Sequence, residues 1–335
     1  MKNTYDIILN NKYPDILKDF LSYSLSVKGL SPNTIKAYAS DLTLFLKYLL
    51  FTDSLETNME SKTTFEEINI SSFNEEILRM VDLNLLISFI SFAELNLENT
   101  AYARARKVSC LKAFFRYLYE IKEFISSNPC DNLQVPKIPK KQPIYLTLEE
   151  SKLLLATIET HGGKSKERDY CIITLFLNCG LRVSELCSID INKIRNDTLK
   201  VTGKGNKERV IYLNKACLQA LDYYIPIRNS NLKDVKKEDV NALFLSSKKM
   251  RISERSIERI VKKYAQLAGL DYNLLTPHKL RHTSATLMYK YGKVDLRSIQ
   301  NILGHESIST TEIYTHIDEE DLRDAVYANP LNSNE

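Results

Sequence analysis

Three prolines within eight residues divide this chain of 335 residues into two parts. Pro136, Pro139 and Pro143 each lack a backbone N–H and hold the preceding residue extended, which excludes a helix or a central strand. We therefore predict an extended linker at residues 135–143, between a first domain at residues 1–134 and a second at residues 144–335. Both domains can bury sizeable cores, since 44% of the residues are apolar.

The first part predicts helices. Ser31 and Pro32 are typical of a helix start, an N-cap followed by a proline in the first turn, and apolar residues continue at helical spacing to Leu49. A second helix is expected over about residues 75–94 and a third over about residues 99–122, because apolar side chains repeat there at helical spacing. These patterns together indicate a helical domain.

Charge is distributed unevenly along this first part. The net charge of +4 does not by itself indicate nucleic acid, but residues 51–97 carry nine acidic and two basic side chains, whereas residues 98–143 carry nine basic and four acidic ones. The basic segment is where we would place a phosphate backbone, although charged runs are usually solvated faces and basic stems often cover a core edge. The candidates for DNA contact here are Arg104, Arg106, Lys107, Lys112, Lys140 and Lys141.

The second part begins with helices. Thr147 is typical of an N-cap, and residues 169–179 are apolar nearly all round, which predicts a helix buried at the centre of the domain. Gly180 ends that helix and Arg182 follows it. Such an arginine either recognises phosphate oxygens through two parallel hydrogen bonds or pairs with Glu185, and both hold if Glu185 orients Arg182.

Short strands are expected next, over residues 188–194, 198–201 and 209–213, with a glycine-flanked Lys204 at the turn between the last two. Residues 226–250 are polar with little periodicity and are expected to form a loop. Residues 253–267 predict an amphipathic helix whose outer side carries Arg255 and Arg259. This side either lies in the major groove of DNA or simply faces water.

Four side chains near the C-terminus are spaced for a shared site. A helix that begins just before His278 puts this residue and Arg281 on one face. A second helix, over residues 296–303, is followed by His305, and Tyr314 comes nine residues later. Histidine and arginine offer hydrogen bonds and positive charge to a pentacoordinate phosphorane, and a positioned tyrosine hydroxyl is a competent nucleophile. The spacing therefore favours a covalent phosphotyrosyl intermediate.

A metal is the alternative use of His278 and His282, which are four residues apart. The zinc helix His-Glu-x-x-His requires a glutamate where this chain has Lys279, so no metal is expected. The Walker A pattern is absent as well, which leaves no support for nucleotide hydrolysis, and we expect no cofactor.

Four motifs occur in order along the second part: GLRVSEL at residues 180–186, GKGNKER at 203–209, HKLRH at 278–282, and residues 303–316 with LGH at the start and TEIYTH at the end. Together they resemble the tyrosine recombinases, especially the Xer type. LSPNT at residues 30–34 is similar to the core-binding domain of the same type. The resemblance implies a mainly α-helical protein with a small antiparallel β-sheet, built as a two-domain DNA clamp. A helical SAM-like core-binding domain would join a mixed α+β catalytic domain.

The resemblance also implies which residues bind the scissile phosphate. Arg182 and Arg281 would hold its non-bridging oxygens, with His305 adding a hydrogen bond and Glu185 supporting Arg182. The full catalytic set implied is Arg182, Lys204, His278, Arg281, His305 and Tyr314.

Proton transfers follow from the same resemblance. His278 would take the proton from Tyr314, which attacks to give a 3′-phosphotyrosine and a free 5′-hydroxyl. Lys204 would donate the proton to the leaving oxygen. Neither step needs a metal.

The family resemblance implies double-stranded DNA with inverted-repeat half-sites as the partner. Four protomers on two duplexes would exchange strands through a Holliday junction, with a helix at about residues 320–329 docking on the neighbouring protomer. Whether a second recombinase or an activating protein takes part is left open by the sequence. Xer-type resolution of chromosome dimers is expected. Residues 51–74 look longer and more acidic than the usual helix connection, which keeps open an integrase or invertase of a mobile element.

Two other classes remain as alternatives, a type IB topoisomerase and a DNA-binding protein without chemistry. The six cysteines show no C-x-x-C pair, which fits reduced thiols, and no apolar run reaches the roughly 18 residues of a membrane span. A secretory leader is not evident either. We expect a cytoplasmic protein that acts at the nucleoid.

Overall fold

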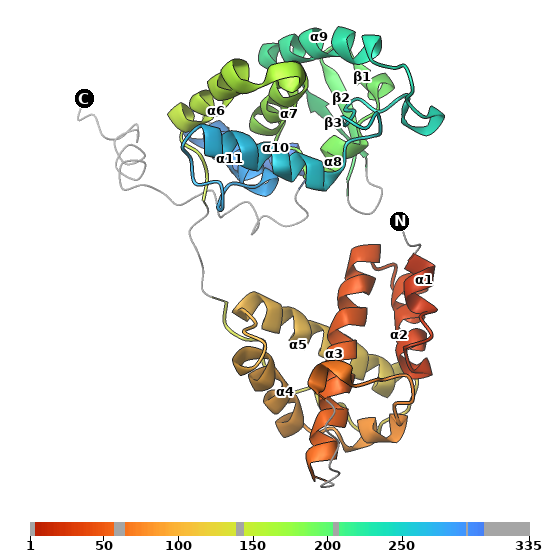
Figure 1. The fold of residues 1–335 in the computed structure, drawn as a ribbon. Coiled ribbons are helices and arrows are strands. Elements are labelled where there is room, and N and C mark those ends of the chain that lie inside the picture. The colour runs from red at the N-terminus through yellow and green to blue at the C-terminus, as the bar shows by residue number, and fades with distance from the viewer. Residues whose placement is uncertain (1–3, 57–63, 139–143, 204–207, 293, 305–335) are drawn as a thin grey trace, which may run out of the picture. The chain divides into compact units, whose positions relative to one another are not determined.

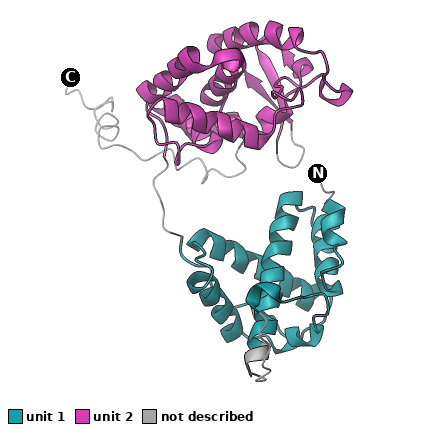
Figure 2. Ribbon diagram, viewed as in Figure 1, with its two compact units in different colours: residues 1–140 teal, residues 141–335 magenta. Residues whose placement is uncertain are grey.

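The computed structural model describes residues 4–56, 64–138, 144–203, 208–292 and 294–304. The chain forms two compact units, residues 1–140 and 141–335, and the boundary falls within the segment predicted as a linker. Figure 2 colours them separately, and each is described by itself. The predicted site residues Lys140, Lys141, Lys204, His305 and Tyr314 and the predicted helix at residues 320–329 lie outside the described residues.

The elements of unit 1 within its described residues are all helices or helical turns (Figure 1). Ser31 Oγ accepts a hydrogen bond from the N–H of Thr34 at 3.2 Å, which confirms the predicted start of the long third helix. The core is rich in phenylalanine, with Phe45 and Phe89 fully buried and their ring centroids 5.1 Å apart. The elements are α1 (Thr4–Ile8), α2 (Asp15–Ser26), α3 (Pro32–Glu56), the 3₁₀ turns η1 (Phe65–Glu67) and η2 (Glu75–Met80), α4 (Leu83–Leu95), α5 (Ala101–Arg116) and the π-helical turn η3 (Tyr117–Ile121).

The predicted single helix over residues 75–94 is wrong. The chain forms the 3₁₀ turn η2, leaves helical geometry at Val81, and starts again as α4. Asp82 explains the break, because its carboxylate accepts a hydrogen bond from the N–H of Leu85 at 2.8 Å. An aspartate stabilises a helix more as its cap than inside it.

Unit 2 combines packed helices with a small sheet at one side (Figure 1). The strands β1 (Ile194–Arg195), β2 (Thr198–Thr202) and β3 (Glu208–Tyr212) pair antiparallel in chain order, with Leu199 opposite Ile211. The helices are α6 (Leu148–His161), α7 (Lys166–Cys179), α8 (Val183–Ser188), α9 (Lys215–Ser230), α10 (Glu254–Leu267), α11 (Pro277–Lys290) and α12 (Leu296–Leu303), with 3₁₀ turns η4 (Gly163–Ser165), η5 (Ile191–Lys193) and η7 (Lys237–Asp239).

Several predicted helix starts in this unit are confirmed. Thr147 and Glu150 form a reciprocal capping box at α6, and Ser253 caps α10 through the N–H of Ser256. Helix α7 lies at the centre of the core, with most of its residues buried, as its apolar pattern predicted. The predicted fold class, mainly α-helical with a small antiparallel sheet, is confirmed.

The predicted strand over residues 188–194 is wrong. Ser188 ends α8, η5 follows, and β1 has only two residues. Isoleucines at positions 189, 191 and 194 suit a strand, but here Ile189 is buried in the core while the backbone turns. A short apolar run is compatible with either structure.

The predicted loop over residues 226–250 is also wrong at its start, because α9 continues through Pro226 to Ser230. Arg228 holds this last turn, since its guanidinium donates to the carbonyl oxygens of Val240 and, at 2.8 Å, of Ala242. A long-range anchor thus outweighs the backbone hydrogen bond that the proline removes.

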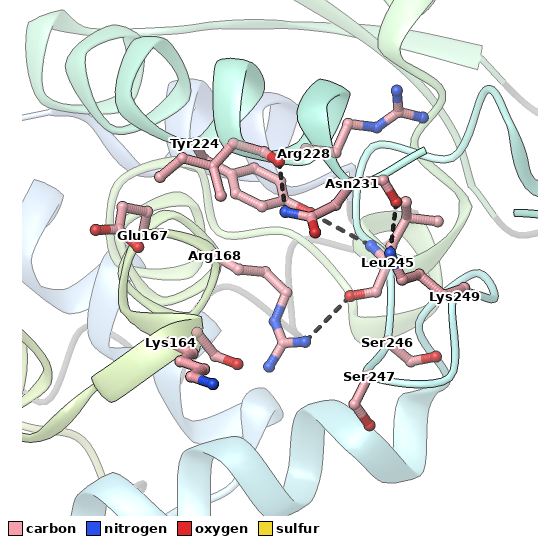
Figure 3. A pocket seen from close by; sticks show the side chains of 12 residues that line it. Lys164, Glu167, Arg168, Tyr224, Arg228, Asn231, Leu245, Ser246, Ser247 and Lys249 are labelled. Carbon is pink, nitrogen blue, oxygen red and sulfur yellow. Dashed lines mark hydrogen bonds between the residues drawn. The ribbon is translucent and has the colours of Figure 1, made fainter. Parts of the chain in front are cut away.

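A pocket beside α9 shows how the rest of this segment is held (Figure 3). Arg168 donates to the carbonyl of Leu245 at 3.1 Å, and Lys249 donates to the carbonyl of Asn231 at 2.8 Å. The cations that line the pocket are therefore used mainly to anchor the segment to α7 and α9.

Membrane insertion finds no support in the described part of the chain. None of the helices described there is long and apolar enough to cross a bilayer.

Candidate active site

The ends of α7 and α12 meet at two glycines. Gly180 ends α7 with φ +57°, a left-handed conformation that glycine adopts without strain. A Cβ atom at this position would lie 2.5 Å from a methyl group of Leu303, so a side chain would also clash with α12. Gly304 ends α12 in the same conformation, with φ +67°. The local sequence therefore brings two helix ends into close contact.

Arg281, on α11, ties these helix ends together. Its guanidinium is buried and donates to the carbonyl of Gly180 at 2.6 Å and to the carbonyl of Leu303 at 2.7 Å. Both carbonyls belong to the ends of helices, where backbone acceptors lack an intrahelical donor and carry partial negative charge. The arginine is thereby fixed in one orientation.

Glu185 is the centre of the site. Its buried carboxylate accepts hydrogen bonds from the backbone N–H and the guanidinium of Arg182, both at 2.8 Å. Arg209, on β3, binds both oxygens, with Nη2 to Oε2 at 3.0 Å, and Arg281 Nη1 lies 3.9 Å from Oε2. Arg182 also donates to the carbonyl of Gly304 at 2.8 Å. We call Glu185 with these three arginines the arginine cluster.

The charge state of Glu185 follows from these contacts. Burial alone would raise the pKa of Glu185, but the hydrogen bonds from Arg209 and Arg182 outweigh it and place the pKa below its ordinary value. The carboxylate is therefore ionised at neutral pH. Three guanidiniums against one carboxylate leave the arginine cluster with a formal charge of 3 − 1 = +2.

Two imidazoles lie beside the cluster on α11. The Nε2 atoms of His278 and His282 are 3.0 Å apart, with their rings nearly perpendicular, so one imidazole donates a hydrogen bond to the other. Partial burial lowers the pKa of His278, and the positive charges of Arg281, Lys279 and Arg182 lower it further. His278 is therefore neutral at neutral pH and can accept a proton.

Helix α11 is also fixed to the start of unit 2. The N–H of Leu146 donates to Oγ1 of Thr283 at 2.9 Å, and both residues are buried. Thr283 follows Arg281 by two positions. The chain that enters unit 2 is thus bonded to the helix that carries His278 and Arg281.

Comparison with known proteins decides the family. Residues 145–321 match the phage integrase family, and residues 17–62 match the phage integrase N-terminal SAM-like domain. A tyrosine recombinase XerC of Caldanaerobacter subterraneus subsp. tengcongensis is 50% identical over 96% of this chain and 88% of its own. The chain belongs to the phage integrase family, among Xer-type tyrosine recombinases.

Further relatives agree with this family. A tyrosine recombinase XerD of Rickettsia bellii is 32% identical over 96% of this chain and 100% of its own. The solved structure of the XerH site-specific recombinase bound to a palindromic difH substrate has the same fold, with a TM-score of 0.71 and 22% identity over 97% of this chain and 96% of that one. The predicted resemblance to Xer recombinases is confirmed.

The structure brings part of the predicted catalytic set of this recombinase together. Arg182, Glu185 and Arg281 are joined directly, and the charges of both arginines act on His278. The predicted ion pair between Arg182 and Glu185 is present at 2.8 Å. The remaining members, Lys204, His305 and Tyr314, fall in segments that the structure does not describe.

The predicted DNA contacts of unit 1 need correction. Lys107 is only 5% exposed and pairs with the buried carboxylate of Asp41 at 3.1 Å, so its ammonium is used in an internal ion pair. Arg104 is mostly buried and pairs with Glu94. These side chains face inward because α5 packs against α3 and α4.

Other candidates stay accessible. Arg106 is half exposed although it binds Asp41, Lys112 is partly exposed, and Arg255 and Arg259 lie on the exposed side of α10. These four remain predictions for DNA contact.

Two residues of the site were not predicted in these roles. Arg209 closes the GKGNKER motif as its last residue, but its partner Glu185 is 24 positions away in sequence. His282 was weighed only as a metal ligand, and its spacing of four from His278 was the signal for a direct contact. In the described part of the chain, no group of three histidine, cysteine or acidic side chains is placed to hold a metal.

Proposed function

We propose that this recombinase cleaves a DNA strand with Tyr314 and rejoins it to a partner strand. The observation that supports this most is the convergence of Arg182 and Arg281 at one place, with the net charge of +2 of the arginine cluster. A surplus of fixed guanidiniums suits a phosphodiester whose charge grows as it becomes pentacoordinate.

Phosphate binding comes first in this mechanism. Arg281 is held by the carbonyls of Gly180 and Leu303, so its orientation costs nothing at the moment of reaction. Arg182 is one third exposed, and its contacts with Glu185 and Gly304 leave N–H groups for phosphate oxygens.

Proton transfer is the second part. His278, neutral at neutral pH, accepts the proton of the Tyr314 hydroxyl as that oxygen attacks phosphorus. The bond between phosphorus and the 5′-oxygen breaks, and Lys204 protonates the leaving oxygen. The products are a 3′-phosphotyrosine and a free 5′-hydroxyl.

Strand exchange follows from the energetics of this step. One phosphoester replaces another of similar energy, so a 5′-hydroxyl from a partner strand reverses the reaction without an external energy source. We propose inverted-repeat duplex DNA as the substrate, four protomers on two duplexes, a Holliday-junction intermediate, and resolution of chromosome dimers at the nucleoid. The palindromic difH substrate of the solved XerH relative supports the first of these.

The test uses the full chain and nicked duplexes carrying palindromic sites, in chelator. We expect a covalent protein–DNA product that maps to Tyr314 and is absent in Tyr314→Phe, with duplex binding by this variant unchanged. A covalent product that persists in Tyr314→Phe would assign the nucleophile elsewhere. Failure of the wild-type chain to bind any such duplex would remove the proposal.

A further inference from the structure

Arg209 occupies a place in the arginine cluster that the proposed mechanism does not use. It lies on β3, the strand that follows the hairpin segment containing Lys204. Its side chain is only 16% exposed and binds both oxygens of Glu185 in a parallel, two-bond arrangement. Such a pair is stronger and more directional than a single hydrogen bond.

The packing around Arg209 is close on its other side. A Cβ atom placed on Gly304 would lie 3.3 Å from both Cδ and Nη1 of Arg209. The same glycine presents its carbonyl to Arg182 at 2.8 Å. Arg209 is therefore enclosed between Glu185 and the end of α12, and it has little freedom to turn toward a substrate.

Arg182 and Arg209 therefore compete for the carboxylate of Glu185. Arg182 Nη1 and Arg209 Nη1 both bind Oε1 of this carboxylate. Without Arg209, the formal charge of the cluster would fall from +2 to 2 − 1 = +1, and Glu185 would attract Arg182 alone at short range. An unshared buried carboxylate would then compete with the phosphate for the guanidinium of Arg182.

We infer that Arg209 is a positioning residue that neutralises Glu185, so that Arg182 remains available to the scissile phosphate. The inference rests on the proposed function. Arg209 also fixes β3, the strand that follows the segment containing Lys204, to the arginine cluster. It acts through Glu185 and touches no reacting atom.

The experiment compares the single-turnover rate of covalent-complex formation at saturating nicked duplex in four proteins. They are the wild type, Arg209→Met, the double variant Arg209→Met with Glu185→Gln, and the control Arg251→Met. Arg251 also forms a partly buried pair, with Asp190 at 2.6 Å, but outside the cluster. Duplex affinity and the melting temperature are measured on the same samples.

We expect Arg209→Met to slow cleavage about 100-fold while duplex affinity changes little, because the loss concerns charge available in the transition state. The double variant restores the formal charge to +2, since glutamine is neutral, and should recover at least about tenfold of that rate. Arg251→Met should cleave at the wild-type rate. If Arg209 had only a structural role, removing the carboxylate of Glu185 as well would not restore the cleavage rate.

Two results would overturn the inference, namely wild-type cleavage by Arg209→Met, or a double variant no faster than Arg209→Met. If Arg209→Met does not fold, Arg209→Lys keeps the charge but cannot form two parallel bonds. That variant keeps a positive charge against Glu185, so it should fold and cleave within about tenfold of the wild-type rate, and a loss of about 100-fold would also overturn the inference. A wild-type chain that forms no covalent product removes the proposed function itself, which separates the two failures.

Discussion

Both units of this recombinase bury a carboxylate among basic side chains, but in different proportions. In unit 1, Asp41 on α3 binds Arg106 and Lys107 of α5, which leaves a formal charge of 2 − 1 = +1. In unit 2, Glu185 binds or faces three arginines, for +2. The partners differ too, because Lys107 is buried whereas Arg182 is one third exposed.

The difference separates an internal ion pair from the proposed phosphate site. A lysine ammonium enclosed with an aspartate satisfies that aspartate and offers nothing to a ligand. A guanidinium has more donors than one carboxylate can accept, so Arg182, which is one third exposed, retains N–H groups beyond its pair with Glu185. A basic sequence segment therefore does not by itself identify a DNA contact.

The largest expected effect is on the stability of unit 1, where Asp41 forms the internal ion pair. Asp41→Asn leaves the ammonium of Lys107 buried without its counter-ion, and we expect a loss of about 3–5 kcal/mol in the free energy of unfolding. Urea denaturation measures it. Asp15→Asn, which removes the exposed pair with Lys18, should cost less than about 1 kcal/mol. Equal effects for the two variants would contradict the structural role of Asp41.

The next effect concerns the packing of the arginine cluster. Gly304→Ala introduces a side chain at φ +67° and 3.3 Å from Arg209, whereas Gly269→Ala introduces one at φ +70° with nothing within 4 Å. Both should lose about 1–2 kcal/mol of stability from backbone strain. Only Gly304→Ala should also slow single-turnover cleavage, since it displaces Arg209. Equal cleavage rates would disconnect Gly304 from the cluster.

A smaller expected effect is on the pH dependence of cleavage, which reflects the positive charges around His278. The pKa of His278 lies below its ordinary value of 6.5, so the neutral base persists as pH falls through 6.5 and is lost only at lower pH. The cleavage rate should therefore have its acid midpoint below 6.5. Lys279→Gln removes one of the charges that lower this pKa, and should move the midpoint upward. An unchanged midpoint would show that another group limits the rate.

The smallest expected effect distinguishes accessible from internal cations. Arg259→Gln, on the exposed side of α10, should reduce the slope of log affinity against log salt by about one if this arginine contacts a phosphate. Arg104→Gln, which removes a side chain paired with Glu94, should leave the slope unchanged. Binding titrations at several salt concentrations measure both. The reverse order would reinstate Arg104 as the DNA contact.

Local signals in the sequence predicted the fold well. Thr147 and Ser253 mark helix starts because their hydroxyls bond to N–H groups three residues away, and such short-range contacts are visible in the sequence. The pairing of Arg182 with Glu185 was predictable for the same reason. The continuation of α9 was not, since Arg228 holds it through carbonyls 12 and 14 residues further on.

Long-range partners explain what the sequence did not predict in the site. Lys107 looked like its basic neighbours on α5, and only the approach of Asp41, 66 positions away, makes it internal. Arg209 looked like an ordinary residue at the end of a motif until β3 brought it to Glu185. Charge partners are selected by the tertiary fold, whereas capping residues are selected by their immediate neighbours.

The hydrogen bond between Leu146 and Thr283 has a practical consequence for dissecting this protein. An isolated catalytic fragment that begins at residue 141 keeps the N–H of Leu146 as a donor to α11. A fragment cut at Leu148, where α6 begins, removes that donor and leaves the hydroxyl of Thr283 without it, on the same helix as His278 and Arg281. The few residues before α6 therefore support α11, and the choice of fragment end decides whether the helix that carries His278 and Arg281 keeps this contact.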